Sequence, residues 1–192
     1  APGGSVPMLC TTTQQPAQSD IGAFRTVCDF SHMNFDDPLV FPGQPGKTHL
    51  HAYFGNTAAN AHSTPESIAT TGNSTCRGGT VNRSAYWVPA MIDTRTNAVL
   101  RPDAMMIYYK AGYNGIASAD INPMPARLRI IAGDARASTP QHMVGYKCES
   151  PGGPALADIP VCNVGNRVQM SVDFPQCWDG VNLDSANHKD HM

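Results

Sequence analysis

The sequence predicts an all-β protein, a β-sandwich or jelly roll with long loops and short helical turns. Short apolar or alternating segments recur between clusters of turn residues, and no long helical period is present. The chain holds 17 glycines and 16 prolines among its 192 residues, a content that suits many turns. Frequent short strands separated by turns are typical of sandwiches and jelly rolls.

Two parts of the chain differ in composition. Residues 1–22 are rich in proline, threonine, glutamine and serine and lack apolar periodicity, which predicts an extended N-terminal arm tethered by Cys10. The remaining length and an apolar content of 41% are compatible with one sizeable core. We therefore expect a single disulfide-bonded, β-rich domain over residues 23–192.

The expected elements are mostly strands. Those segments are 23–30, 50–54, 84–92, 104–111, 128–132, 143–148 and 167–174. Pro89 cannot donate a ladder hydrogen bond, which places its strand at a sheet edge or a bulge. Ser63 or Thr64 is expected to cap a short helical turn that runs to Ala69, with Pro65 in its first turn.

The cysteines indicate an oxidising compartment. Six are scattered along the chain without a C-x-x-C pair, which favours three disulfides over a zinc knuckle or a redox motif. Cys148 and Cys162 flank a turn-rich excursion and are expected to pair locally. The opening Ala1-Pro2-Gly3-Gly4 resembles a mature end left after processing, so a secreted, extracellular protein is expected.

Charge and hydropathy exclude some partners. A formal net charge of −2, with only 15% charged residues, argues against nucleic acid and against an anionic membrane surface. No apolar run approaches the length needed to span a bilayer. Two N-glycosylation acceptor sequences are present, Asn73-Ser74-Thr75 and Asn82-Arg83-Ser84, and they matter in a eukaryotic secretory pathway.

A histidine pair is the strongest chemical signal. His49 and His51 lie two apart in a strand-like run, and alternate side chains of a strand share a face. Two adjacent imidazoles can act as base, acid or metal ligands, although a solvated sheet face has the same pattern. His32 lies upstream in the same histidine-rich stretch.

A second polar cluster lies at the C-terminus. It holds Asp179 and Asp184 with His188 and His191, which stand three apart and would share a face on one helical turn. A solvated, frayed tail is the competing interpretation. One functional site requires these residues to meet the histidine pair in space.

Several motifs together resemble the secreted family catalogued as domain of unknown function 1996. The resemblance covers roughly residues 23–192 and rests on segments 30–38, 49–51, 54–56, 86–90, 108–110, 174–180, 182–185 and 188–192. It implies polysaccharide or cell-wall surroundings, and the family's name assigns no activity. Members similar to this chain continue beyond the final His191-Met192 into a further strand-rich portion, which predicts a fragment or a processed product.

The leading functional hypothesis is a carbohydrate-active hydrolase or lyase acting on a polysaccharide or cell-wall glycan. Its cleft would be lined by the catalytic candidates His32, His49, His51, Asp179, Asp184 and His191. Tyr86, Trp87 and Tyr109 would form flat walls for sugar rings, with Lys110 as a charge neutraliser. Hydrolysis would pair Asp36 or Asp37 with Asp179 or Asp184, whereas elimination would use a histidine or tyrosine base.

Two other classes of function stay open. His49 and His51, completed by His32 or His191, would form an imidazole set suited to zinc or copper. A non-catalytic glycan-binding domain would use the same aromatic residues without needing the histidines.

Overall fold

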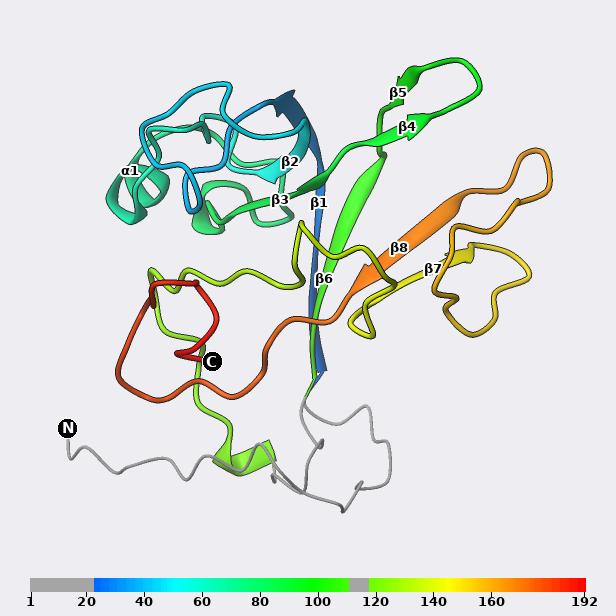
Figure 1. Cartoon of the computed structure of the whole chain (residues 1–192). Helices are drawn as coiled ribbons and strands as arrows, with labels where there is room; N and C mark the ends of the chain where they lie inside the picture. Colours follow the sequence, from blue (N-terminus) through cyan, green and yellow to red (C-terminus); the bar gives the residue numbers. More distant parts are fainter. Residues whose placement is uncertain (1–22, 111–117) are drawn as a thin grey trace. The chain divides into compact units, whose positions relative to one another are not determined.

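The computed structural model describes residues 23–110 and 118–192 (Figure 1). This part of the chain holds eight β-strands, one six-residue α-helix and two 3-10 turns, and all strand pairs are antiparallel. The all-β fold class is therefore confirmed, while the packing of two sheets into a sandwich stays a prediction.

The described residues group into two compact units, one ending at Pro123 and one spanning Met124–Met192. The expected single domain over residues 23–192 stays a prediction, and the expected arm over residues 1–22 lies outside the described residues.

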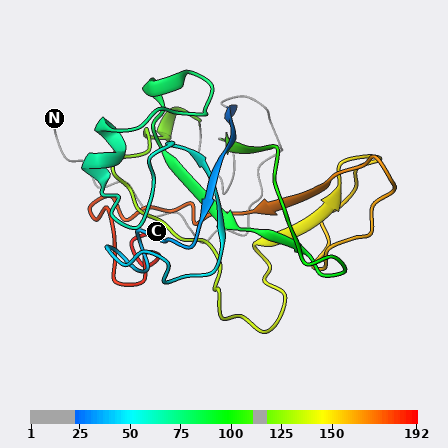
Figure 2. The same ribbon diagram turned by 90° about the horizontal axis from the view of Figure 1, so that it is seen from above.

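A four-stranded antiparallel sheet organises the first unit. Its strand order is β3-β2-β1-β6, so β1 lies between β2 and β6 (Figure 1 and Figure 2). The bounds are β1 Ala23–Asn34, β2 His51–Gly55, β3 Ala85–Pro89 and β6 Ala104–Lys110. Pro89 ends β3, which is an edge strand, as expected. At a sheet edge, the backbone N–H that proline lacks leaves no buried acceptor unpaired.

One face of this sheet carries the apolar core. Its buried members come from the inward positions of β1 and β2 and from the loop after β2: Cys28, Ala52, Phe54 and Cys76. Partly buried side chains of β1, β3 and β6 pack around them: Phe30, Met33, Tyr86, Val88, Met105 and Ile107. Ala52 and Phe54 alternate along β2, which places His51 and Tyr53 on the opposite face.

A β-bulge interrupts β1 at Ser31. Phe30 pairs with Phe54 and His32 pairs with Tyr53, so β1 advances two residues where β2 advances one. The extra residue reverses the alternation of β1, which moves His32 from the core face to the face that carries His51 and Tyr53. The bulge therefore brings His32 to the histidine pair.

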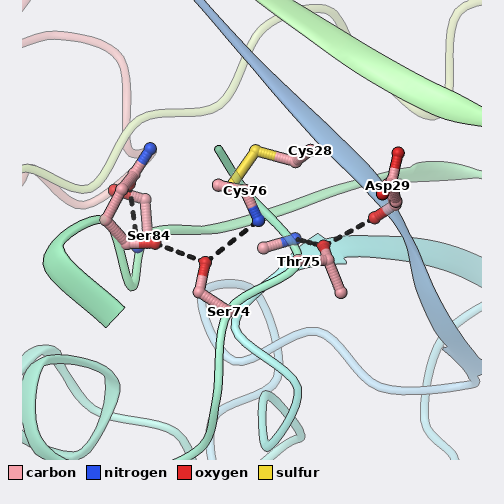
Figure 3. The surroundings of a disulfide bond; sticks show 8 residues. Cys28, Asp29, Ser74, Thr75, Cys76 and Ser84 are labelled. Atoms are coloured by element: carbon pink, nitrogen blue, oxygen red, sulfur yellow. Dashed lines mark hydrogen bonds between the residues drawn. A yellow bond between two sulfur atoms is a disulfide. The ribbon is translucent and has the colours of Figure 1, made fainter. Parts of the chain in front are cut away.

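The Cys28–Cys76 disulfide joins β1 to the loop between β2 and β3. Backbone hydrogen bonds from Asp29 N to Thr75 O and from Arg77 N to Val27 O extend the sheet across this junction. Thr75 Oγ1 donates to Asp29 O at 2.6 Å (Figure 3). It also accepts from Gly55 N at 2.9 Å. The disulfide and the hydrogen bonds beside it hold the loop as an added strand.

Short elements complete the first unit. Helix α1 spans Pro65–Thr70, and Thr64, one of the two expected caps, is its N-cap. Ser67 closes a capping box, and the helix ends one residue beyond the expected Ala69. The hairpin of β4 (Met91–Asp93) and β5 (Ala98–Leu100) splits off the end of the strand expected over 84–92. The 3-10 turns are η1 (Gly79–Val81) and η2 (Ser118–Asp120).

The second unit contains the hairpin of β7 (Val144–Cys148) and β8 (Val168–Val172). Cys148 and Cys162 are bonded, as expected, and Cys177 is disulfide-bonded as well. An open hollow of about 410 Å³ lies beside this hairpin, and none of the predicted site residues lines it.

Two expectations for the second unit were wrong. Residues 128–132 form no strand, because Arg129 N and Ile131 N donate to Leu183 O and His188 O of an irregular segment instead of to a ladder. His188 and His191 do not share a helical turn, since residues 186–191 fold into turns and bends with His188 at φ 57°.

Candidate functional site

The histidine pair is formed as predicted. The ring centroids of His49 and His51 lie 4.4 Å apart with the ring planes at 62°. His49 is exposed just before β2, and His51 is buried at its first position, 4% exposed. The pair therefore combines one solvent-facing imidazole with one that the fold holds in place.

The tautomer of His51 follows from its hydrogen bond. Its Nδ1 lies 2.9 Å from the backbone carbonyl oxygen of Asp36, which can only accept, so Nδ1 carries the proton. In the neutral ring Nε2 then bears a lone pair. A backbone acceptor on one nitrogen is the usual device that orients a histidine for catalysis or metal binding through the other.

Burial keeps His51 neutral. Desolvation lowers the pKa of His51 most, and the positive charge that His49 can carry lowers it further. The hydrogen bond to Asp36 O and the charge of Asp37 oppose this effect. The result is an uncharged imidazole at neutral pH, which is the protonation state of a base or of a metal ligand.

Tyr53 supports the same carbonyl. Its hydroxyl donates to Asp36 O at 2.7 Å, so that oxygen accepts from both Tyr53 and His51. Burial raises the pKa of Tyr53, and the nearby Asp37 and Asp36 charges raise it further. Tyr53 therefore stays protonated and serves to position His51 and the Asp36 backbone.

The adjacent carboxylates Asp36 and Asp37 act as structural acceptors. Asp36 accepts from Gly46 N at 2.9 Å and from Ala61 N at 3.0 Å, one on each oxygen. Asp37 Oδ1 accepts from the backbone N–H groups of the turn that follows it, and its Oδ2 accepts from Trp87 Nε1 at 3.2 Å. Both carboxylates are buried and occupied, and they fold residues 35–48 onto the histidine face.

A stack of rings extends from the pair across the sheet. His32 stacks on Tyr53 at 4.8 Å and 9°, and Tyr53 stacks on Trp87 at 5.6 Å and 21°. His32 Nε2 donates to Ala59 O, and its Nδ1 faces the Ser31 hydroxyl, so both ring nitrogens have partners within the fold. His32 is thus part of the support for the site, with no nitrogen left for a ligand.

The predicted binding residues divide between the two faces. Trp87 lies with Tyr53, whereas its neighbour Tyr86 packs on the core face and contacts Tyr109. Lys110 pairs with Ala23 at the first residue of β1, whereas His51 pairs with Asn34 at the last. Tyr86 and Tyr109 thus lie on the core face and Trp87 lies beside Tyr53, while Lys110 is far along the sheet from His51. A role for each in binding substrate stays a prediction.

The second unit contains an ionic cluster. Asp184 Oδ1 lies 2.6 Å from His188 Nδ1, and Asp184 Oδ2 lies 2.9 Å from the Arg129 guanidinium. His188 therefore has its Nδ1 proton held by a carboxylate, leaving Nε2 for other partners.

His191 is oriented in a comparable way by Ser185. The Ser185 hydroxyl donates its one proton to Asn187 Oδ1 at 3.2 Å and accepts from Lys189 N. The hydroxyl oxygen therefore accepts from His191 Nδ1 at 2.9 Å. Among the described residues, His191 Nε2 has no hydrogen-bond partner although His191 is only 2% exposed.

Asp179 is a turn-forming carboxylate. Its Oδ1 accepts from Val181 N and Asn182 N, and its Oδ2 accepts from Asn182 Nδ2. The bond from Val181 N does most to lower the pKa of Asp179, followed by the Asn182 side chain. The group stays ionised, so it is unsuited to donate a proton as a general acid.

A protein metal site needs several side-chain ligands that converge on one point. Within residues 23–110 and 118–192, no three His, Cys, Asp or Glu side chains converge in an arrangement that could hold an ion.

Also within these residues, no helix has the length and apolar character needed to cross a membrane.

These features define a disulfide-bonded, antiparallel β-protein with an oriented histidine pair on one sheet face. Residues 37–192 match the model of a domain of unknown function, DUF1996, and the chain belongs to that family. No curated protein and no solved structure matches this chain.

Sequence reasoning missed Tyr53. The signal was present, because Tyr53 follows His51 by two residues on the same strand and so had to share its face. The same rule applied to Tyr86 and Trp87, which are adjacent on β3 and so had to point apart.

Proposed function

We propose that this protein is a secreted, carbohydrate-active protein that cleaves a polysaccharide or cell-wall glycan at the His49–His51 pair. The observation that carries the proposal is the His51 ring, buried, neutral and oriented through Nδ1, beside the exposed ring of His49. Secretion is supported by the two described disulfides.

Elimination fits this site better than hydrolysis. Two-carboxylate hydrolysis needs one carboxyl group that can donate a proton and one that is free to attack or activate water. Asp36 and Asp37 instead accept backbone and indole N–H groups through all four of their oxygens. A neutral histidine needs no second carboxylate to remove a proton from carbon.

The proposed step is β-elimination from a uronic acid. His51 Nε2 takes the proton from C5, the electron pair forms the C4=C5 double bond, and the C4–O bond breaks. The leaving oxygen takes a proton from the imidazolium of His49, which can recover one from solvent. Trp87, on the same face, supplies an aromatic side chain against which a sugar ring can pack.

The test is a panel of uronate-containing and neutral polysaccharides, scored for chain cleavage and for ultraviolet absorbance of the unsaturated product. We expect absorbance with at least one uronate polymer and a loss of at least about 100-fold in His51→Ala, the size of a lost general base. His62→Ala removes an exposed loop histidine of the same unit and should retain activity.

Other outcomes point elsewhere. New reducing ends without absorbance would indicate hydrolysis and would overturn the elimination step. Retention on a polysaccharide without cleavage would favour the glycan-binding alternative. Metal binding is favoured only by the orientation of His51 through a backbone carbonyl, and stoichiometric zinc or copper that disappears in a His49→Ala/His51→Ala variant would establish it.

A further inference from the structure

We propose that Asn73 carries an N-linked glycan, attached before the Cys28–Cys76 disulfide closes. The inference rests on the secretion proposed above and applies in a pathway that performs N-glycosylation. Both acceptor sequences, Asn73-Ser74-Thr75 and Asn82-Arg83-Ser84, lie in the loop between β2 and β3, on either side of Cys76.

The folded protein has room for a sugar on Asn73. The side chain is exposed, and Thr57 holds this residue through its backbone: Asn73 N donates to Thr57 Oγ1, and Asn73 O accepts from Thr57 N. The carboxamide oxygen accepts from Ser74 N at 2.8 Å. A glycan on Nδ2 keeps the carbonyl oxygen and the backbone, so each of these bonds survives.

Asn82 is a poorer candidate. It is half-buried directly after the 3-10 turn η1, its backbone oxygen accepts from Ser74 Oγ at 2.5 Å, and its Oδ1 lies 3.4 Å from Ser84 N. A bulky saccharide here would stand against the junction that Ser74 closes (Figure 3). The geometry therefore favours Asn73 over Asn82.

The order of events follows from Thr75. The acceptor sequence requires the hydroxyl two residues after the asparagine. In the fold, that hydroxyl donates to Asp29 O (Figure 3) and accepts from Gly55 N. The backbone of Thr75 is also bonded, its N to Gly55 O and its O to Asp29 N. The next residue is Cys76, so a closed disulfide fixes the acceptor in the sheet. Attachment must precede this closure.

The chemistry is a group transfer from a lipid-linked oligosaccharide pyrophosphate. The Asn73 amide nitrogen forms a bond to C1 of the first sugar, the C1–O bond to the pyrophosphate breaks, and the lipid pyrophosphate leaves. The amide nitrogen loses one proton. No oxidant or reductant is required.

The first experiment assigns the site. The chain is fused to a heterologous secretion leader, so that entry into the pathway does not depend on its natural location, and is expressed in a eukaryotic host. Peptide mass spectrometry before and after amidase release should find the glycan on Asn73. Asn73→Gln should lose it, and the matched Asn82→Gln should keep it. An unmodified Asn73, or a glycan on Asn82 alone, would overturn the assignment without bearing on glycan cleavage.

The second experiment tests the order. Unglycosylated, oxidised protein is incubated with membranes that contain the transferase and its lipid-linked donor, beside the same protein reduced and unfolded. We expect modification of the unfolded sample alone. Equal modification of the folded, oxidised sample would show that the acceptor is accessible after closure and would refute the order.

Discussion

At the residue scale, Asp36 shows how one side chain shapes the site. Its carboxylate accepts from Gly46 N and Ala61 N, while its backbone oxygen accepts from His51 and Tyr53. The first pair of bonds holds the surrounding loops, and the second pair sets the tautomer of the histidine. A carboxylate that looks catalytic in sequence is thus the anchor of His51, the residue proposed as the base.

Replacing Asp36 with asparagine should therefore be costly. The amide group would present N–H to a backbone N–H, which leaves a buried donor unpaired and removes two charge-assisted bonds, with an expected loss of about 2–4 kcal/mol of unfolding free energy. Asp93→Asn is the control, because Asp93 accepts comparable bonds in the exposed turn between β4 and β5. Urea unfolding should show a clearly smaller loss there, and equal losses would contradict a special role for Asp36.

His51 makes a pH-dependent contribution to stability. Burial lowers its pKa in the folded state, so between that value and about 6.5 the unfolded chain binds more protons. Its contribution is therefore complete above about pH 6.5 and is lost as the pH falls through the folded pKa. The measurement is the unfolding free energy between pH 4 and pH 8 for the natural chain and for His51→Gln. The difference between them should shrink as the pH falls, with His62→Gln as control, and a difference that does not vary with pH would contradict this account.

At the scale of elements, the junction of β1, β2 and the following loop depends on Gly55. Gly55 has φ +81°, and an added Cβ would lie 2.1 Å from Ser84 O and 3.3 Å from Cys76 Sγ. Gly55→Ala should lower the unfolding free energy by about 3 kcal/mol, because backbone strain adds to a clash with rigid backbone. Gly43→Ala shares the left-handed conformation with no atom within 4 Å, so about 1 kcal/mol is expected. Similar losses in urea unfolding would show that the junction can relax.

Removal of each of the two described disulfides should lower the unfolding free energy by a different amount. Cys28 and Cys76 are 48 residues apart and buried in the core, whereas Cys148 and Cys162 close a 14-residue excursion. Chain entropy gives losses of about 4 and about 3 kcal/mol for the paired alanine variants, and the cavity left in the core adds to the first. Amide hydrogen exchange should report faster opening of β1 and β2 in Cys28→Ala/Cys76→Ala and of β7 and β8 in the other variant. Exchange that increases uniformly in both would contradict local anchoring.

At the scale of the whole molecule, the sequence predicted what depends on period and turn chemistry. Side-chain alternation placed His49 and His51 together, and Thr64 with Pro65 located the helix start. The face of His32 depends on a bulge at Ser31 that no residue pattern announces. The irregular course of residues 128–132 depends on carbonyls more than 50 positions away, such as Leu183 O. Local propensity carries no information about such distant partners. Long-range pairing thus separates the parts of the fold that could be predicted from those that could not.

The whole-molecule charge gives a last prediction, on the class of polymer that this protein binds. A formal net charge of −2, with 13 Lys and Arg against 15 Asp and Glu, provides no broad positive field for the closely spaced phosphates of DNA. Affinity for nucleic acid that arises from phosphate neutralisation falls steeply with salt. Immobilised DNA should therefore not retain the protein at about 0.1 M salt. Retention on a uronate polymer, the proposed substrate, also involves ring packing and hydrogen bonds, so it should fall less steeply with salt than retention on DNA between about 0.05 and 0.2 M. An equally steep salt dependence on both supports would indicate a local basic surface and would contradict glycan recognition through ring packing and hydrogen bonds.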